Sequence, residues 1–100
     1  MTKSVLNDVY QTLLEMGAVK NESEFSKDWL GRSECYMRTC RFNKTKPSIG
    51  ALAICASKLQ NYGNRALGDD KERPIADRLL VLSDACQQQI SQQCLELWSH

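Results

Sequence analysis

The sequence predicts an all-α protein of about five helices, the last of them long. Apolar residues recur at the three- and four-residue spacing that gathers them on one face of a helix. Residues that favour helix ends separate these segments, whereas the final stretch from Ile75 to Trp98 contains no Gly or Pro. One hundred residues with 42% hydrophobic content suit a single globular core.

The first helix is expected from about Ser4 to Met16, and Gly17 follows it. Its apolar residues recur at the spacing of a wide buried face, namely Val5, Leu6, Val9, Tyr10, Leu13 and Leu14. In the polar linker that comes next, Asn21 with Glu24 matches a capping box, and Ser23 is a competing N-cap. Both positions remain open as the start of the second helix.

Two short helices joined by a tight turn are expected next. Phe25 and Trp29 lie four residues apart, so the second helix places them on one buried face. Gly31 ends this helix because glycine tolerates the positive φ of a helix C-terminus, and Ser33 is a good N-cap for the third helix. A turn this short makes the two helices cross.

The third helix is predicted from Glu34 to about Phe42, with Met37 and Cys40 on its buried side. Asn43 is expected to end it in a left-handed conformation. An extended basic connector follows from Lys44 to Pro47, because proline biases the preceding residue away from helical geometry.

The fourth helix is expected to begin after Ser48, which is placed to cap it. Its apolar stripe consists of Ile49, Leu52, Ala53, Ala56 and Leu59. Residues 61–73 contain glycines, asparagines and charges without periodicity, which predicts a linker loop. Arg73-Pro74 then opens the last helix, where proline suits the first turn.

The last helix has more apolar surface than a small four-helix core is expected to cover. Its stripe consists of Ile75, Leu79, Leu82, Cys86, Ile90, Cys94 and Leu97. One interpretation is that the helix folds back and completes the core of its own chain. The other, which we favour, is a two-fold homodimer interface. That interface would be formed by Leu82, Cys86, Ile90, Cys94, Leu97 and Trp98.

The order of these elements resembles that of a known family. The residues that carry the likeness are Leu30-Gly31, Ser33, Met37, Cys40, the Lys44 to Lys46 connector, Pro47-Ser48, Leu52, Ala56 and Leu59. Together they resemble the lambda-repressor-like (XRE or Cro-type) helix-turn-helix DNA-binding domain. This chain departs from that pattern with Glu22 and Ser26 where the family often has Gln and Ala, and with Asn43 where Gly is usual. The resemblance implies a helix-turn-helix core in residues 1–60, and the residue patterns described above place the linker in 61–73 and a C-terminal helix in 74–100.

The resemblance also implies a small regulator that binds double-stranded DNA, with the third helix as its recognition helix. Base edges would be read by Ser33, Glu34, Cys35, Arg38 and Thr39. Phosphates would be contacted by Arg32, Tyr36, Arg41, Lys44 and Lys46. Two of these side chains have a second interpretation. Glu34 is equally suited to stabilise a helix N-terminus, and Tyr36 to pack against a neighbouring helix.

The charge distribution agrees with a DNA-binding surface. The chain has a net charge of only +1, but residues 32–46 hold five cations and one carboxylate, for a local net charge of +4. A charged stretch can also be a solvated face with no ligand. An interaction module that keeps the helical fold and binds a protein partner is therefore the alternative function.

Enzymatic, metal-binding and membrane functions are not expected. His100 is the only histidine, so neither a catalytic triad nor a zinc site has suitable partners, and no cofactor is predicted. Five cysteines without a CxxC pair favour reduced thiols and a cytoplasmic location, because disulfides are rare there. No apolar run is long enough to cross a membrane. Cys35 is the one thiol expected to be exposed, either as a redox switch or as an inert side chain.

Overall fold

The computed structural model describes residues 4–98, and over this range the chain forms five α-helices and no strand. The elements are α1 (Val5–Glu15), α2 (Glu22–Leu30), α3 (Tyr36–Asn43), α4 (Ile49–Ala66), the short 3₁₀ helix η1 (Asp70–Glu72) and α5 (Arg73–Trp98). The predicted all-α class with a long C-terminal helix is confirmed. The molecule measures 46 × 29 × 26 Å.

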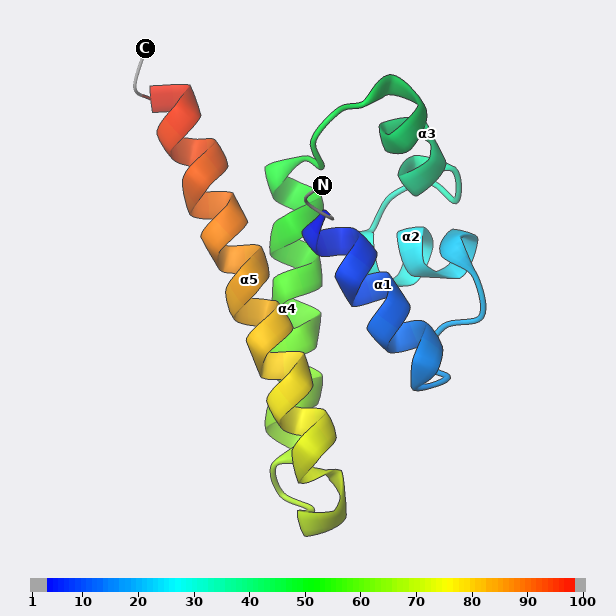
Figure 1. The fold of residues 1–100 in the computed structure, drawn as a ribbon, viewed down its shortest axis with the longest axis vertical. Helices are drawn as coiled ribbons and strands as arrows, with labels where there is room; N and C mark the ends of the chain where they lie inside the picture. Colours follow the sequence, from blue (N-terminus) through cyan, green and yellow to red (C-terminus); the bar gives the residue numbers. More distant parts are fainter. Residues whose placement is uncertain (1–3, 99–100) are drawn as a thin grey trace.

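A long antiparallel hairpin of α4 and α5 forms the backbone of the fold (Figure 1). On this hairpin α1 packs against α5, and α2 packs against α4. The short helix α3 packs against α2, at the end of the molecule where α4 begins (Figure 1). The last turns of α5 extend past the beginning of α4 at this same end. The hairpin therefore positions α3 without covering it.

Small residues allow the two hairpin helices to approach closely. A Cβ atom added to Gly63 of α4 would lie 2.8 Å from Cγ and Cδ2 of Leu80 on α5, so this contact requires glycine. Ser83 of α5 is buried, and its hydroxyl donates to the carbonyl oxygen of Ala56 at 2.9 Å. The one polar side chain of α5 that is buried in this interface is thus hydrogen-bonded, as a buried hydroxyl must be to avoid a desolvation cost.

Three polar side chains fix the starts of α-helices. The hydroxyl oxygens of Ser4 and Ser48 accept from backbone N–H groups in the first turns of α1 and α4, at 3.1 Å each. For α2 the cap is Asn21, whose Oδ1 accepts from the N–H of Glu24 at 2.9 Å. This decides between the two candidate caps of α2 in favour of Asn21 over Ser23.

The core draws on all five helices. Phe25, Trp29 and Met37 are buried as predicted. On α1 the buried face is narrower than expected, because Leu14 is 37% exposed and Thr12 is buried in its place. Ser26 is fully buried, and its hydroxyl has no hydrogen-bond partner among residues 4–98.

The predicted linker loop over residues 61–73 is wrong for most of its length. The helix α4 continues to Ala66, and η1 begins only four residues later, at Asp70. Packing explains the difference, because Gly63 fits against α5 and the ring of Tyr62 lies 5.3 Å from that of Trp29. Such tertiary contacts outweigh the weak helix propensity of the asparagines and glycine in this stretch.

Two cysteines meet inside the hairpin, and one of them corrects a prediction. Cys55 of α4 and Cys86 of α5 are free thiols with no exposed surface. A hydrogen bond with Cys86 and burial both raise the pKa of the Cys55 thiol, so this group stays protonated. The assignment of Cys86 to a dimer interface is wrong, because the side chain is enclosed within its own chain.

The rest of α5 agrees in part with both interpretations of the last helix, namely that it completes the core of its own chain and that it forms a dimer interface. Leu82 and Ile90 pack against the core of the same chain, which supports the folded-back arrangement. Cys94 is half-buried. Beyond it, Leu97 and Trp98 are 70% and 72% exposed, and they form the part of the predicted dimer surface that lies open.

Candidate nucleic-acid interface

The candidate recognition segment consists of α3 and the turn of residues 31–35 that precedes it. The turn begins at Gly31, whose φ of 63° is left-handed, as the sequence predicted. The helix itself starts at Tyr36 and not at Glu34, and Ser33 does not cap it. Instead, the carbonyl oxygen of Ser33 accepts from the N–H of Tyr36 at 3.0 Å, so a separate turn precedes the helix.

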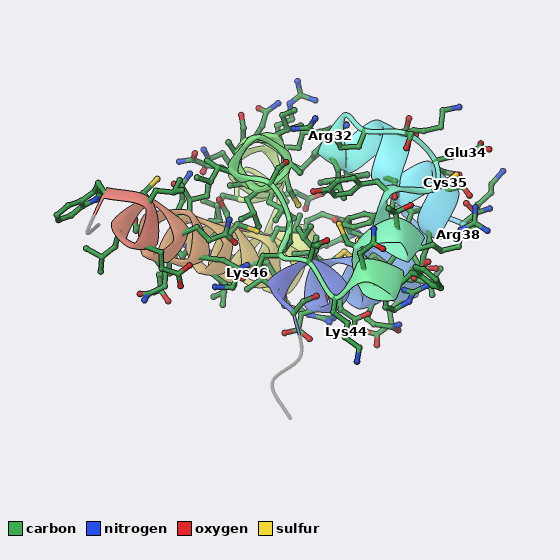
Figure 2. The ribbon with its side chains drawn as sticks, turned by 90° about the horizontal axis from the view of Figure 1, so that it is seen from above. Arg32, Glu34, Cys35, Arg38, Lys44 and Lys46 are labelled. Carbon is green, nitrogen blue, oxygen red and sulfur yellow. The ribbon has the colours of Figure 1, made fainter. Side chains whose placement is uncertain are left out.

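Three of the predicted base-reading residues therefore lie in this turn and two on α3. Ser33, Glu34 and Cys35 belong to the turn, whereas Arg38 and Thr39 lie on the helix. All five side chains are exposed. Figure 2 shows Arg32, Glu34, Cys35 and Arg38 along one side of the molecule, so the predicted set is brought together although its secondary structure differs.

Tyr36 connects the start of α3 to the start of α4. Its hydroxyl oxygen accepts from the backbone N–H of Ser48 at 2.8 Å, and the two hydroxyl oxygens are 3.4 Å apart. The Tyr36 hydroxyl is thus engaged within the fold. Of the two interpretations of this residue, the structural one holds, and Tyr36 is no longer a candidate for a phosphate contact.

Arg32 is held against the same junction but remains exposed. Its Nη2 atom donates to Oγ of Ser48 at 2.9 Å, and its guanidinium carbon lies 5.9 Å from the centroid of the Tyr36 ring. Gly50 leaves the space for this arrangement, since a Cβ atom there would lie 2.9 Å from Nη2. The guanidinium is therefore positioned in advance beside the turn, and the residue remains exposed.

Two of the predicted phosphate-binding cations are paired with carboxylates. Arg41 donates to both oxygens of Glu22 on α2, at 2.6 and 3.0 Å. The ammonium of Lys46 lies 3.0 Å from both oxygens of Glu96 on α5. These pairs halve the local net charge of +4 and fix α3 to α2 and the connector to α5.

The left-handed end of α3 is displaced by one residue from its predicted place. Asn43 is still helical, and Lys44 has the positive φ of 55° instead. The N–H groups of Lys44 and Thr45 donate to carbonyl oxygens of the last turn of α3, which ends the helix there. Neither Arg38 nor Lys44 forms an ion pair with another residue of the range 4–98, so both can pair with a ligand.

The Arg41–Glu22 pair makes the attachment of α3 sensitive to acid. The hydrogen bonds from Arg41 lower the pKa of Glu22 below its ordinary value of 4.5. A carboxylate with a lowered pKa stabilises the fold above its unfolded pKa and loses that contribution as the pH falls through its folded pKa. The pair should contribute at most about 1 kcal/mol, because Arg41 is more than half exposed and solvent screens it.

We therefore expect Glu22→Gln to lower the free energy of unfolding at neutral pH and to have little effect in acid. The difference from the wild type should stay constant from neutrality down to just above pH 4.5 and shrink as the pH falls through 4.5 and below, measured by urea unfolding at a series of pH values. Glu15→Gln is the control, since Glu15 makes a single contact of 3.3 Å with Arg78 and is 65% exposed. A difference that stays constant across the pH series would contradict the assignment.

Sequence reasoning missed three residues at this surface. Phe42, which the sequence predicts only as the approximate last residue of the third helix, is 88% exposed near the C-terminus of α3. Glu22 and Glu96 neutralise two cations of the basic segment, but they lie far from that segment in the chain. Periodicity would have placed Phe42 outside the Met37 and Cys40 face, whereas no local pattern indicates the two ion pairs.

The fold and the site together define a small all-α protein in which an exposed turn and a short basic helix stand at one end of a helical hairpin. The chain belongs to the Family of unknown function (DUF6626), whose model matches residues 6–99. No curated protein and no solved structure matches the chain. The family match covers the hairpin as well as the basic segment, but membership in the family assigns no activity. Within the described residues, none of the helices is both long and apolar enough to span a membrane.

Proposed function

We propose that this protein is a non-catalytic, sequence-specific DNA-binding regulator that uses α3 and the preceding turn. The observation that carries the proposal is that Arg32, Cys35 and Arg38 are exposed on one side of the molecule (Figure 2), with Thr39 also exposed on α3. A helix with its side chains is about 10–12 Å across, which fits the roughly 12 Å width of the major groove.

The side chains of this surface match the chemistry of a DNA duplex. Arg38 has the planar donor pair that binds O6 and N7 of guanine, and Thr39 can contact a thymine methyl group. Glu34 can accept from the exocyclic amine of cytosine. Arg32 and Lys44 flank these side chains and are suited to neutralise phosphates, which fixes the orientation of the protein on the duplex.

The overall charge distribution supports the same orientation. Residues 69–72, at the turn of the hairpin, contain three carboxylates and one lysine. This turn lies at the end of the molecule opposite to α3 (Figure 1). With the flanking Arg65 and Arg73, this end carries as many cations as carboxylates, so it does not attract a polyanion, and the net positive charge of the basic segment favours contact through α3.

A binding series across salt tests the proposal. Duplexes that the protein selects from a random pool are used in filter-binding titrations at increasing salt concentration. With two or three phosphates neutralised by each protomer, the logarithm of the binding constant should fall against the logarithm of salt with a slope of about −2 to −3 for each protomer bound. Binding to no duplex in the pool, or binding that does not respond to salt, would refute the DNA-binding proposal.

We further propose that the regulator acts as a homodimer through the end of α5. Leu95, Leu97 and Trp98 leave a large apolar surface in the last turns of this helix. A two-fold axis there would present two copies of α3, as needed for half-sites about 34 Å apart on one face of a duplex.

The dimer proposal predicts that Leu97→Asp converts the protein to a monomer. A carboxylate in a buried apolar interface is costly, whereas in the monomer it would be solvated because Leu97 is 70% exposed. Light scattering at tens of micromolar should give twice the chain mass for the wild type and a single chain mass for the variant. Val81→Asp is the control, because Val81 is also exposed on α5 but lies outside the proposed interface. A monomeric wild type would remove the dimer without affecting the proposal of DNA binding.

A protein-interaction module is the second candidate function, and Phe42 is the observation that favours it. An aromatic ring that is 88% exposed is a typical anchor for a protein partner, and aromatic residues are enriched at such anchors. The pairing of Arg41 and Lys46 with carboxylates also reduces the charge available to DNA. The salt series separates the two candidates, because only the first requires affinity for a duplex.

A further inference from the structure

A groove of about 580 Å³ lies where α1, α2, α4 and α5 meet, away from the candidate DNA surface. Its apolar wall includes Leu13 and Met16 at the end of α1 and Leu79 of α5. Its other wall contains Trp29 of α2 and Tyr62 of α4. The volume is within the range of about 300–1,000 Å³ that is usual for small-molecule sites.

Two neighbouring aromatic rings line one side of this groove, and a cation lies over each of them. The ammonium of Lys58 lies 4.9 Å from the centroid of the Trp29 ring, and the Trp29 and Tyr62 rings are 5.3 Å apart. The guanidinium of Arg65 lies 5.8 Å from the Tyr62 ring. Trp29 is almost fully buried, whereas Tyr62 is 43% exposed, so one aromatic ring remains accessible to a ligand.

Positively charged groups outnumber negatively charged groups in the groove. Lys27 and Lys58 contribute two ammonium groups, and Asp28 contributes one carboxylate. Lys58 also donates to the backbone carbonyl oxygen of Asp28, which holds its ammonium at the groove. The groove therefore combines an apolar wall, an accessible aromatic ring and a surplus of positive charge. The fold itself holds one of the positive groups, the ammonium of Lys58, beside the aromatic wall.

We propose that this groove binds a small planar aromatic carboxylate. The ring of the ligand stacks on Tyr62 and packs against Leu79, where it gains the apolar and aromatic contacts that the groove offers. The carboxylate pairs with Lys58 and Lys27, and a cation already placed against an aromatic ring pays less entropy to bind it. A cationic ligand of the same shape is excluded by the two ammonium groups.

The experiment uses naphthylacetate and naphthylmethylamine, which share a ring system and differ in the sign of their charge. The chain has two tryptophans, so its proton–nitrogen correlation spectra contain two indole N–H signals, and a Trp98→Phe variant assigns them. Trp29 lies in the groove, whereas Trp98 is 72% exposed in the last turn of α5 and serves as an internal reference.

Naphthylacetate should shift the Trp29 signal saturably and leave that of Trp98 in place, while naphthylmethylamine should shift neither. Lys58→Met should weaken the binding of naphthylacetate about tenfold, because it removes both the ion pair and the cation held against the ring. Tyr62→Leu should weaken it as well and is a second, independent variant. Dispersed spectra of both variants verify that they are folded.

Three results would overturn the proposal. They are the absence of a saturable Trp29 shift at millimolar naphthylacetate, equal shifts by both compounds, and a shift confined to Trp98. Equal shifts would mean that the groove is only an apolar surface, with Lys58 covering Trp29 as a packing feature. The ligand proposal does not rest on DNA binding, so either can fail while the other stands.

Discussion

The Phe25→Ala substitution should lower the free energy of unfolding by about 3–5 kcal/mol relative to the wild type. Phe25 is the largest of the fully buried side chains, and its ring lies 5.5 Å from that of Tyr10 on α1. The substitution removes the apolar contacts that hold α2 to α1 and leaves a cavity. Small domains are stable by only about 5–15 kcal/mol, so this is a large part of the total. Urea unfolding followed by far-ultraviolet circular dichroism measures the change.

The chain contains a matched control for this variant in its only other phenylalanine. Phe42 is 88% exposed, so Phe42→Ala makes the same chemical change where little is buried. Its free energy of unfolding should remain within about 0.5 kcal/mol of the wild type. Equal destabilisation by the two substitutions would contradict the placement of these two side chains. The Phe42→Ala variant also helps to distinguish the two candidate functions. If it loses binding to a protein partner without losing stability, the protein-interaction module is favoured.

The Arg38→Ala variant should bind its selected duplex with a free energy weaker by about 1–3 kcal/mol, and with relaxed preference at one base pair. Arg38 is exposed on α3 and has no ion-pair partner within residues 4–98, so the substitution leaves no carboxylate unpaired. The loss should therefore reflect contact with DNA and not a change in the fold. Filter binding on the selected duplex and on duplexes changed at single positions measures both effects.

Arg73→Ala is the control for charge. It removes the same positive group from the opposite end of the hairpin, where Arg73 is the first residue of α5 and is exposed. If net charge alone mattered, the two variants would lose affinity equally. Retained affinity in Arg73→Ala together with a loss in Arg38→Ala would support binding through α3, whereas equal losses would point to non-specific attraction.

The sequence by itself determined the helical class and most helix boundaries. Apolar periodicity and local caps act within a few residues of one another, so they can be read directly along the chain. Ser48 caps α4, Gly31 ends α2 with a positive φ, and Phe25 and Trp29 are buried together, as their spacing predicted. The exposure of Arg38 and Thr39 followed in the same way from the buried side of α3, marked by Met37.

Only the tertiary structure decided how far each helix extends, which side chains the packing of helices buries and which charges pair. The extension of α4 to Ala66 depends on packing against α5 and Trp29, and the burial of Cys86 depends on the hairpin. The pairing of Arg41 with Glu22 and of Lys46 with Glu96 joins residues 19 and 50 positions apart. Local patterns carry no information about such contacts, because they depend on the relative positions of helices. For this reason the sequence identified a basic segment, whereas the fold determined which of its cations remain available to a ligand.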